Sequence, residues 1–63
     1  MIRRGAKVRY IGDRFEYAKG KVFKVLQKSH SGITLYFPCR YMDGSLHKQQ
    51  VYMPISEFEE VKG

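Results

Sequence analysis

Closely spaced turn residues limit what this chain can fold into more than any other feature of its 63 residues. They divide most of the chain into short segments at Gly5, Gly12–Asp13, Gly20, Ser29–Gly32 and Asp43–Gly44. No segment keeps the apolar period of a helix over several turns. The sequence therefore predicts an all-β protein of short strands, folded as one domain over residues 1–63.

Two strands are expected in the first half of the chain. Apolar and charged residues alternate over 6–11, which is the period of a half-buried strand. Segment 21–27 is rich in β-forming residues, but its apolar residues do not alternate cleanly. This irregularity indicates a bulge and leaves open which face of the strand is buried. Between these strands, 14–19 mixes charges with aromatic rings and is expected to be a long loop.

The second half begins with a strand at 33–37, whose odd-numbered apolar residues share one face. Tyr36 must then face outward, because side chains alternate along a strand. We expect Pro38 to end this strand. Asp43–Gly44 predicts a hairpin turn into a strand at 46–53, because both residues tolerate the positive φ of a tight turn.

The last part of the chain completes a recognisable order of elements. On the strand at 46–53, Lys48, Gln50 and Tyr52 share one face. Residues 55–58 suit one turn of 3-10 helix, before a short closing strand at 59–61. This order predicts a five-stranded SH3-like barrel, which also removes exposed sheet edges. An open meander of the same strands is the alternative.

Charge is distributed unevenly along the chain. Residues 1–38 carry nine Lys or Arg against two acids, whereas residues 39–63 carry three bases against four acids. The formal net charge is +6. A field of this sign favours an anionic partner: nucleic acid, an acidic protein or an anionic membrane surface. The apolar stretches are too short to span a membrane.

No residue pattern predicts catalysis, a metal site or a cofactor. Cys39 is the single cysteine and cannot form an internal disulfide, so a reducing, cytoplasmic setting is the simplest expectation. His30 and His47 form no close ligand pair, and a tetrahedral zinc site needs four ligands. Ser29 and Ser31 flank His30, but no acid is placed to orient that base. We therefore expect a non-enzymatic binding module.

The loop at 14–19 and the outward strand positions are the candidate binding residues. Bases neutralise phosphates while aromatic rings stack on nucleobases. The alternative is that the loop rings fold onto the small core as a lid. The expected nucleic-acid or partner-binding residues are Arg3, Arg4, Arg9, Arg14, Phe15, Tyr17, Lys19, Lys21, Lys24 and Tyr36. A secondary interface is expected around the hairpin, at Arg40, Tyr41, Met42 and Tyr52.

Residues 5–26 also follow a known pattern. Gly5-Ala6-Lys7-Val8-Arg9-Tyr10-Ile11-Gly12 and Gly20-Lys21-Val22-Phe23-Lys24-Val25 give a glycine, a valine-centred strand, a loop and then Gly-x-Val with a second strand. This pattern resembles the KOW motif of ribosomal proteins and transcription elongation factors. The resemblance implies weakly sequence-specific binding of RNA or single-stranded DNA, within a transcription or translation complex.

The two ends of the chain carry a second resemblance. Arg4-Gly5-Ala6-Lys7-Val8-Arg9 and Glu57-Phe58-Glu59-Glu60-Val61 are similar to the ends of the ferredoxin-docking subunit of photosystem I, another SH3-like barrel. This resemblance implies a docking module whose basic face meets an acidic protein. A small viral or mobile-element protein that binds a host enzyme is a further alternative.

Overall fold

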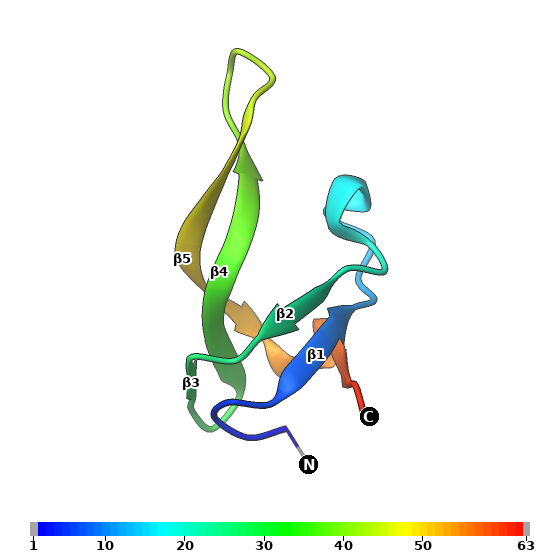
Figure 1. Cartoon of the computed structure of the whole chain (residues 1–63), viewed down its shortest axis with the longest axis vertical. Helices are drawn as coiled ribbons and strands as arrows, with labels where there is room; N and C mark the ends of the chain where they lie inside the picture. The colour runs from blue at the N-terminus through cyan, green and yellow to red at the C-terminus, as the bar shows by residue number, and fades with distance from the viewer. Residues whose placement is uncertain (1, 63) are drawn as a thin grey trace.

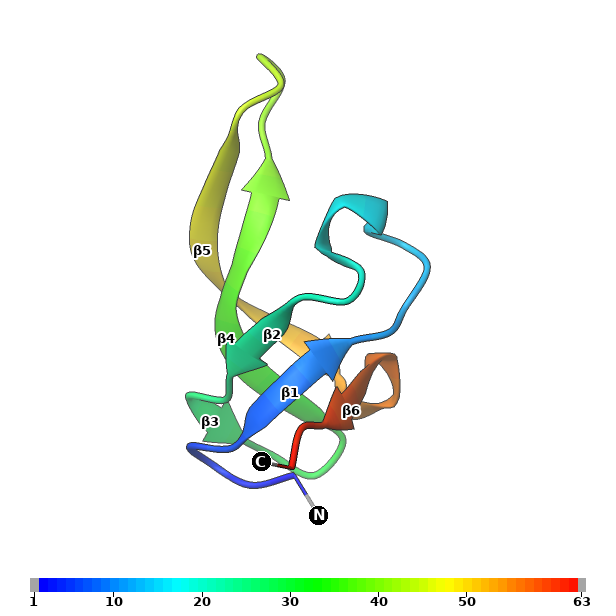
Figure 2. The same ribbon diagram turned by 45° about the vertical axis from the view of Figure 1, so that its right-hand side comes forward.

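The computed structural model describes residues 2–62, and this part of the chain is all-β, as expected. Six strands form two three-stranded antiparallel sheets, with the orders β2-β1-β6 and β3-β4-β5 (Figures 1 and 2). Two single turns of 3-10 helix complete the architecture. The elements are β1 (Lys7–Tyr10), η1 (Glu16–Ala18), β2 (Val22–Lys24), β3 (Gln27–Lys28), β4 (Gly32–Arg40), β5 (Leu46–Pro54), η2 (Ile55–Glu57) and β6 (Phe58–Glu60).

The described chain has six strands instead of five because the expected strand at 21–27 is divided in two. Val25 donates its N–H to the carbonyl of Ala6, beside β1, at 2.9 Å. Leu26 donates its N–H to the carbonyl of Thr34, in β4, at 2.8 Å. The backbone therefore passes from one sheet to the other between these neighbours. This crossing explains why the apolar residues of the segment do not alternate.

Strand β4 continues through Pro38, so the expectation that this proline ends the strand was wrong. The carbonyl of Thr34 points toward β3, where it accepts the bond from Leu26. Thr34 and Pro38 are an even number of residues apart, and the backbone groups of alternate residues point to the same side of a strand. The nitrogen of Pro38 therefore also points to the side where β3 lies. There β3 pairs only with Ile33 and Thr34. No paired strand therefore lies opposite the nitrogen of Pro38, which is itself buried, and the missing N–H costs no ladder bond.

Strands β4 and β5 form a long hairpin that extends beyond the other strands (Figure 1). Their register is unbroken along all nine residues of β4. The expected turn at Asp43–Gly44 joins them, although only Gly44 uses a positive φ, of +87°. Tyr41 donates its N–H to the carbonyl of Ser45 at 2.8 Å, so residues 42–44 form the loop.

Buried side chains from both sheets meet around Tyr10. Its ring centroid lies 5.3 Å from those of Phe37 and Phe58, in edge-to-face contacts that favour aromatic pairs. The alternation expected for 6–11 and 33–37 is confirmed by the burial of their inward residues. The core consists of Ile2, Val8, Tyr10, Ala18, Val25, Ile33, Leu35, Phe37, Met53 and Phe58.

A polar corner connects this core to η2, which lies at the position expected for the 3-10 turn. The Tyr10 hydroxyl donates to Oε1 of Glu57 at 2.9 Å. Arg14 donates to the same carboxylate through Nε at 3.2 Å and Nη2 at 2.7 Å. The bonds from Arg14 lower the pKa of the Glu57 carboxyl, although partial burial opposes them. Burial raises the pKa of the Tyr10 hydroxyl, and the Glu57 carboxylate adds to that effect.

We expect Glu57→Gln to lower the free energy of unfolding by about 1 kcal/mol at neutral pH, because two charge-assisted bonds from Arg14 are lost. A lowered pKa in the folded protein stabilises it above the ordinary glutamate pKa of about 4.3, and the stabilisation disappears as pH falls through the folded value. Urea unfolding between neutral pH and pH ~3 should therefore show a flatter acid dependence for this variant.

Glu59→Gln is the matched control for this experiment. Glu59 pairs with Arg9 at 3.1 Å, and both side chains are about half exposed. An exposed pair contributes little to stability, so this variant should unfold like the wild type. Equal losses in the two variants would show that the polar corner has no special role.

Candidate nucleic-acid interface

Two exposed tyrosines lie on the outer face of the β3–β4–β5 sheet. Tyr36 is 53% exposed and Tyr52 is 59% exposed. Tyr36 lies opposite Gln50. Tyr52 lies opposite Thr34, which is two positions from Tyr36 along β4. Opposite residues of an antiparallel pair project to the same side, so the two rings share one face of the sheet on neighbouring strands.

Contacts with the β3–β4 turn hold the ring of Tyr52 in place. The hydroxyls of Tyr52 and Ser29 lie 2.7 Å apart and form a hydrogen bond. The ring lies over Gly32, where an added Cβ would overlap ring atoms. Glycine therefore lets the ring rest directly on the backbone of β4. Hydrogen bonds from Ser29 and Ser31 lower the pKa of the Tyr52 hydroxyl.

Polar side chains surround the two rings. Gln50 and Lys48 lie on β5 with the parity of Tyr52, and both are exposed. Gln27 of β3 lies opposite Thr34 on the same face. The alternation of residues 46–53 places Lys48 and Gln50 on one face with Tyr52, but only Tyr52 was expected at an interface. The missing information was the register that brings them beside Tyr36.

The loop aromatics occupy the position of a lid. The ring centroid of Phe15 lies 5.3 Å from that of Phe37 and 6.0 Å from that of Tyr17. The guanidinium of Arg14 lies 5.2 Å from the ring centroid of Phe15, and that of Arg40 lies 4.9 Å from the ring centroid of Tyr17. Both rings are half-buried and engaged within the molecule. The alternative of packing onto the core describes them better than stacking on a ligand.

Three of the expected phosphate-binding bases are already paired with acids. Arg9 pairs with Glu59, and Arg14 pairs with Glu57. Lys19 pairs with Asp13 at 2.8 Å. These cations remain exposed, but each has a carboxylate beside it.

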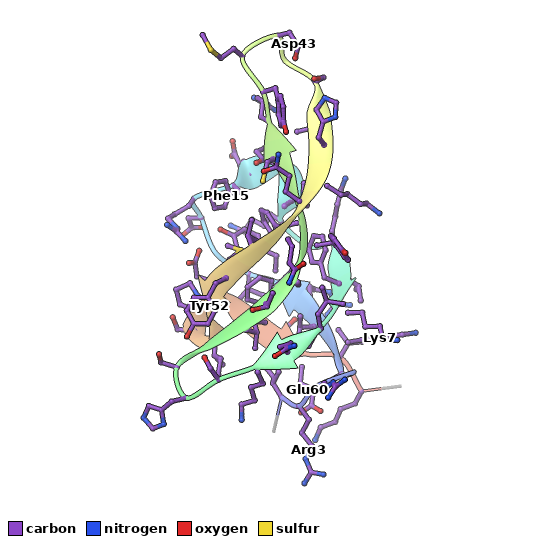
Figure 3. The ribbon with its side chains drawn as sticks, turned by 90° about the vertical axis from the view of Figure 1, so that its left-hand side faces the viewer. Arg3, Lys7, Phe15, Asp43, Tyr52 and Glu60 are labelled. Carbon is purple, nitrogen blue, oxygen red and sulfur yellow. The ribbon has the colours of Figure 1, made fainter. Side chains whose placement is uncertain are left out.

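The other expected bases lie outside the β3–β4–β5 sheet, which carries the two tyrosines. Lys24 lies directly opposite Lys7 across β1 and β2, and both are exposed. Within residues 2–62, neither forms an ion pair. Figure 3 places Lys7 and Tyr52 on opposite sides of the molecule. Arg3 and Arg4 lie in the turn before β1, and Lys21 directly precedes β2.

The secondary interface expected around the hairpin is divided in the structure. Tyr41 and Met42 lie at the hairpin tip, where Met42 is fully exposed and Tyr41 contacts Gln49. Arg40 lines a hollow of about 490 Å³ with residues of the η1 loop and of the hairpin. Figure 2 shows how the η1 loop and the hairpin lie relative to each other. Tyr52 joins Tyr36 on the outer sheet face.

Neither a metal-binding cluster nor a membrane-spanning helix occurs in the part of the chain that the structure describes. No group of three or more His, Cys, Asp or Glu residues there could hold a metal ion. No helix within residues 2–62 is long and apolar enough to cross a membrane.

Comparison with known proteins adds no assignment. No protein-family model, no curated protein and no solved structure matches this chain. Function is therefore inferred from the residues of the site.

We expect Ser29→Ala to raise the pKa of the Tyr52 hydroxyl toward its ordinary value of about 10, because the principal bond that stabilises the phenolate is lost. Following the ring carbons of Tyr52 by NMR between neutral and alkaline pH measures this shift. Ser45→Ala, at the hairpin tip, is the control and should leave Tyr52 unchanged. An unaltered Tyr52 titration in Ser29→Ala would contradict the bond.

We also expect Lys24→Glu to stabilise the fold, because a repulsive cross-strand pair becomes an attractive one. The melting temperature should rise by about 1–4 °C, and the gain should shrink in high salt. Lys28→Glu, whose partner in the register is Ile33, is the matched control. A loss of stability in Lys24→Glu would show that the lysine stems stabilise the sheet more than their charges repel.

Proposed function

We propose that this protein is a non-enzymatic module that binds single-stranded nucleic acid, RNA or DNA, across the outer face of the β3–β4–β5 sheet. The observation that carries this proposal is the pair of exposed tyrosines on one face of an antiparallel sheet. Nucleobases of any sequence can stack on an aromatic ring, so such a face binds with little sequence preference. Sheet-borne aromatic residues are also a recurrent way of binding single-stranded RNA.

The surroundings of the rings suit the same ligand. The side-chain amides of Gln50 and Gln27 can donate and accept hydrogen bonds at base edges. Lys48 supplies a cation on this face for phosphate. The formal net charge of +6 attracts a polyanion from a distance and makes binding sensitive to salt.

We infer that the fold belongs with the SH3-like barrels and that residues 5–26 act as a KOW-like segment. Support comes from the order of elements: a loop after β1, two consecutive strands, β2 and β3, that lie in different sheets, a hairpin, and a 3-10 turn before β6. A role within a transcription or translation complex follows from that assignment and is part of the proposal.

Tyr36→Ala and Tyr52→Ala should each weaken binding of a short single-stranded RNA by about 1–3 kcal/mol, or roughly 5- to 150-fold in Kd. Fluorescence anisotropy with a labelled oligouridine measures the affinity. Tyr36→Phe and Tyr52→Phe keep the rings and should retain most of the binding. Tyr41→Ala, which removes an exposed tyrosine at the hairpin tip, is the control and should bind like the wild type.

Equal effects in all three alanine variants, or no effect in any, would remove stacking from the site. Heparin provides the second comparison, because it carries charge but no bases. If heparin binding tracks RNA binding in every variant and both vanish at about 200 mM salt, the attraction is only electrostatic. An acidic protein would then be the better candidate partner.

A further inference from the structure

Strand β5 has one side without a hydrogen-bonding partner in the described chain. It lies at the end of the β3–β4–β5 sheet and pairs only with β4. This side extends along Leu46–Pro54, which makes it long for an edge strand. An exposed edge of this length is a template for pairing with another strand.

The residues that face this edge follow from the hydrogen bonds of the hairpin. The bond from Tyr41 to Ser45 shows that odd-numbered residues exchange bonds between β4 and β5. The register is unbroken, so this parity holds along both strands. The backbone groups of Lys48, Gln50 and Tyr52 therefore point away from β4, toward the open edge.

The two edges of this sheet differ in a way that bears on pairing. The part of β4 that extends beyond β3 carries Pro38, which is buried and has no N–H, so it resists the addition of another strand. In β5, the residues that face the open edge include no proline until Pro54, at its end. Of these two edges, only that of β5 offers an uninterrupted row of donors and acceptors.

The side chains of β5 are compatible with a second copy of the same strand. In an antiparallel pair centred on Gln50, each Gln50 faces its counterpart, and Lys48 faces Tyr52. On the other face of the sheet, Gln49 faces Val51. No like charges lie directly opposite each other in this pairing. A basic partner strand would instead favour acidic residues in β5, and β5 contains none. Both amides of the Gln50 pair can donate and accept.

We propose that the protein forms a two-fold symmetric dimer by pairing β5 with β5 of a second copy. The two sheets then form one sheet of six strands, in the order β3-β4-β5-β5-β4-β3. Its outer face carries Tyr36 and Tyr52 from both copies. Dimerisation itself is independent of the ligand; its role in nucleic-acid binding rests on the proposed function.

The proposed dimer doubles the length of single-stranded nucleic acid that can lie across the tyrosine-bearing face. A nucleic acid long enough to reach both copies gains affinity through the linkage of two sites. A shorter nucleic acid that reaches only one copy gains no such affinity. The dimer is expected to be weak, because the interface is one pair of strands.

Gln50→Pro tests the dimer with little disturbance of the hairpin. It removes an N–H that faces the open edge and leaves the bonds between β4 and β5 in place. Gln50→Ala is the matched control, because it removes the same side chain and keeps the N–H. Sedimentation from the low micromolar to the millimolar range should show self-association of the wild type and Gln50→Ala. Gln50→Pro should stay monomeric throughout.

Amide hydrogen exchange of the wild type gives a test that needs no variant. On raising the protein concentration, the amides of Lys48, Gln50 and Tyr52 should gain protection. Those of Val51 and Met53, which already face β4, should change little. Absence of self-association at millimolar concentration, or protection gained elsewhere, would overturn the proposed dimer.

Binding measurements separate this proposal from the proposed function. Doubling the length of the oligonucleotide should tighten binding to Gln50→Ala by at least about tenfold, and to Gln50→Pro by much less, because both variants lack the same side chain of the binding face and only Gln50→Ala dimerises. If RNA binds and depends on the tyrosines while the protein stays monomeric, only the dimer is wrong. If the dimer forms but the tyrosine variants bind RNA normally, only the nucleic-acid site is wrong.

Discussion

The buried ring of Tyr10 and its hydroxyl are the constraint on which the rest of this structure depends. The ring packs between Phe37 of one sheet and Phe58 of the other, while the hydroxyl reaches Glu57 in η2. Its backbone also bonds with Lys21 and Gly20, at the end of the first loop. A single residue thus connects the two sheets to the first loop and to η2. In a chain this small, few other contacts can perform that role.

This arrangement leaves the β4–β5 hairpin anchored at one end only. Its inner residues contribute Leu35 and Met53 to the core, whereas the tip carries only local contacts. The proposed binding face lies over the anchored half, where Tyr52 rests on Gly32 and bonds to Ser29. A rigid sheet, rather than the first loop, therefore presents the aromatic rings. Such a site needs little ordering when a ligand binds.

Alternation was enough to predict the all-β class, the inward faces of 6–11 and 33–37, and the outward position of Tyr36. It failed where tertiary context decides. Pro38 is tolerated in β4 only because β3 has already ended, and the division of 21–27 reflects a passage between sheets. The sequence also could not indicate that Tyr36 and Tyr52 lie side by side, because this depends on the register of the hairpin, which alternation within one strand does not specify. Whether the rings of Phe15 and Tyr17 pack onto the core or stack on a ligand likewise depends on the core residues beneath them, which the loop sequence does not specify.

The register itself is determined far from the tyrosines, by the loop at 42–44. Because the side-chain period of a strand is two, a loop one residue shorter or longer would turn every side chain of β5 to the opposite face. Tyr52 would then point into the core and Met53 into solvent. The hairpin tip thus acts as a gauge of length for a surface it never touches. Its residue count is therefore fixed, and its composition is restricted at Gly44, whose φ of +87° favours glycine.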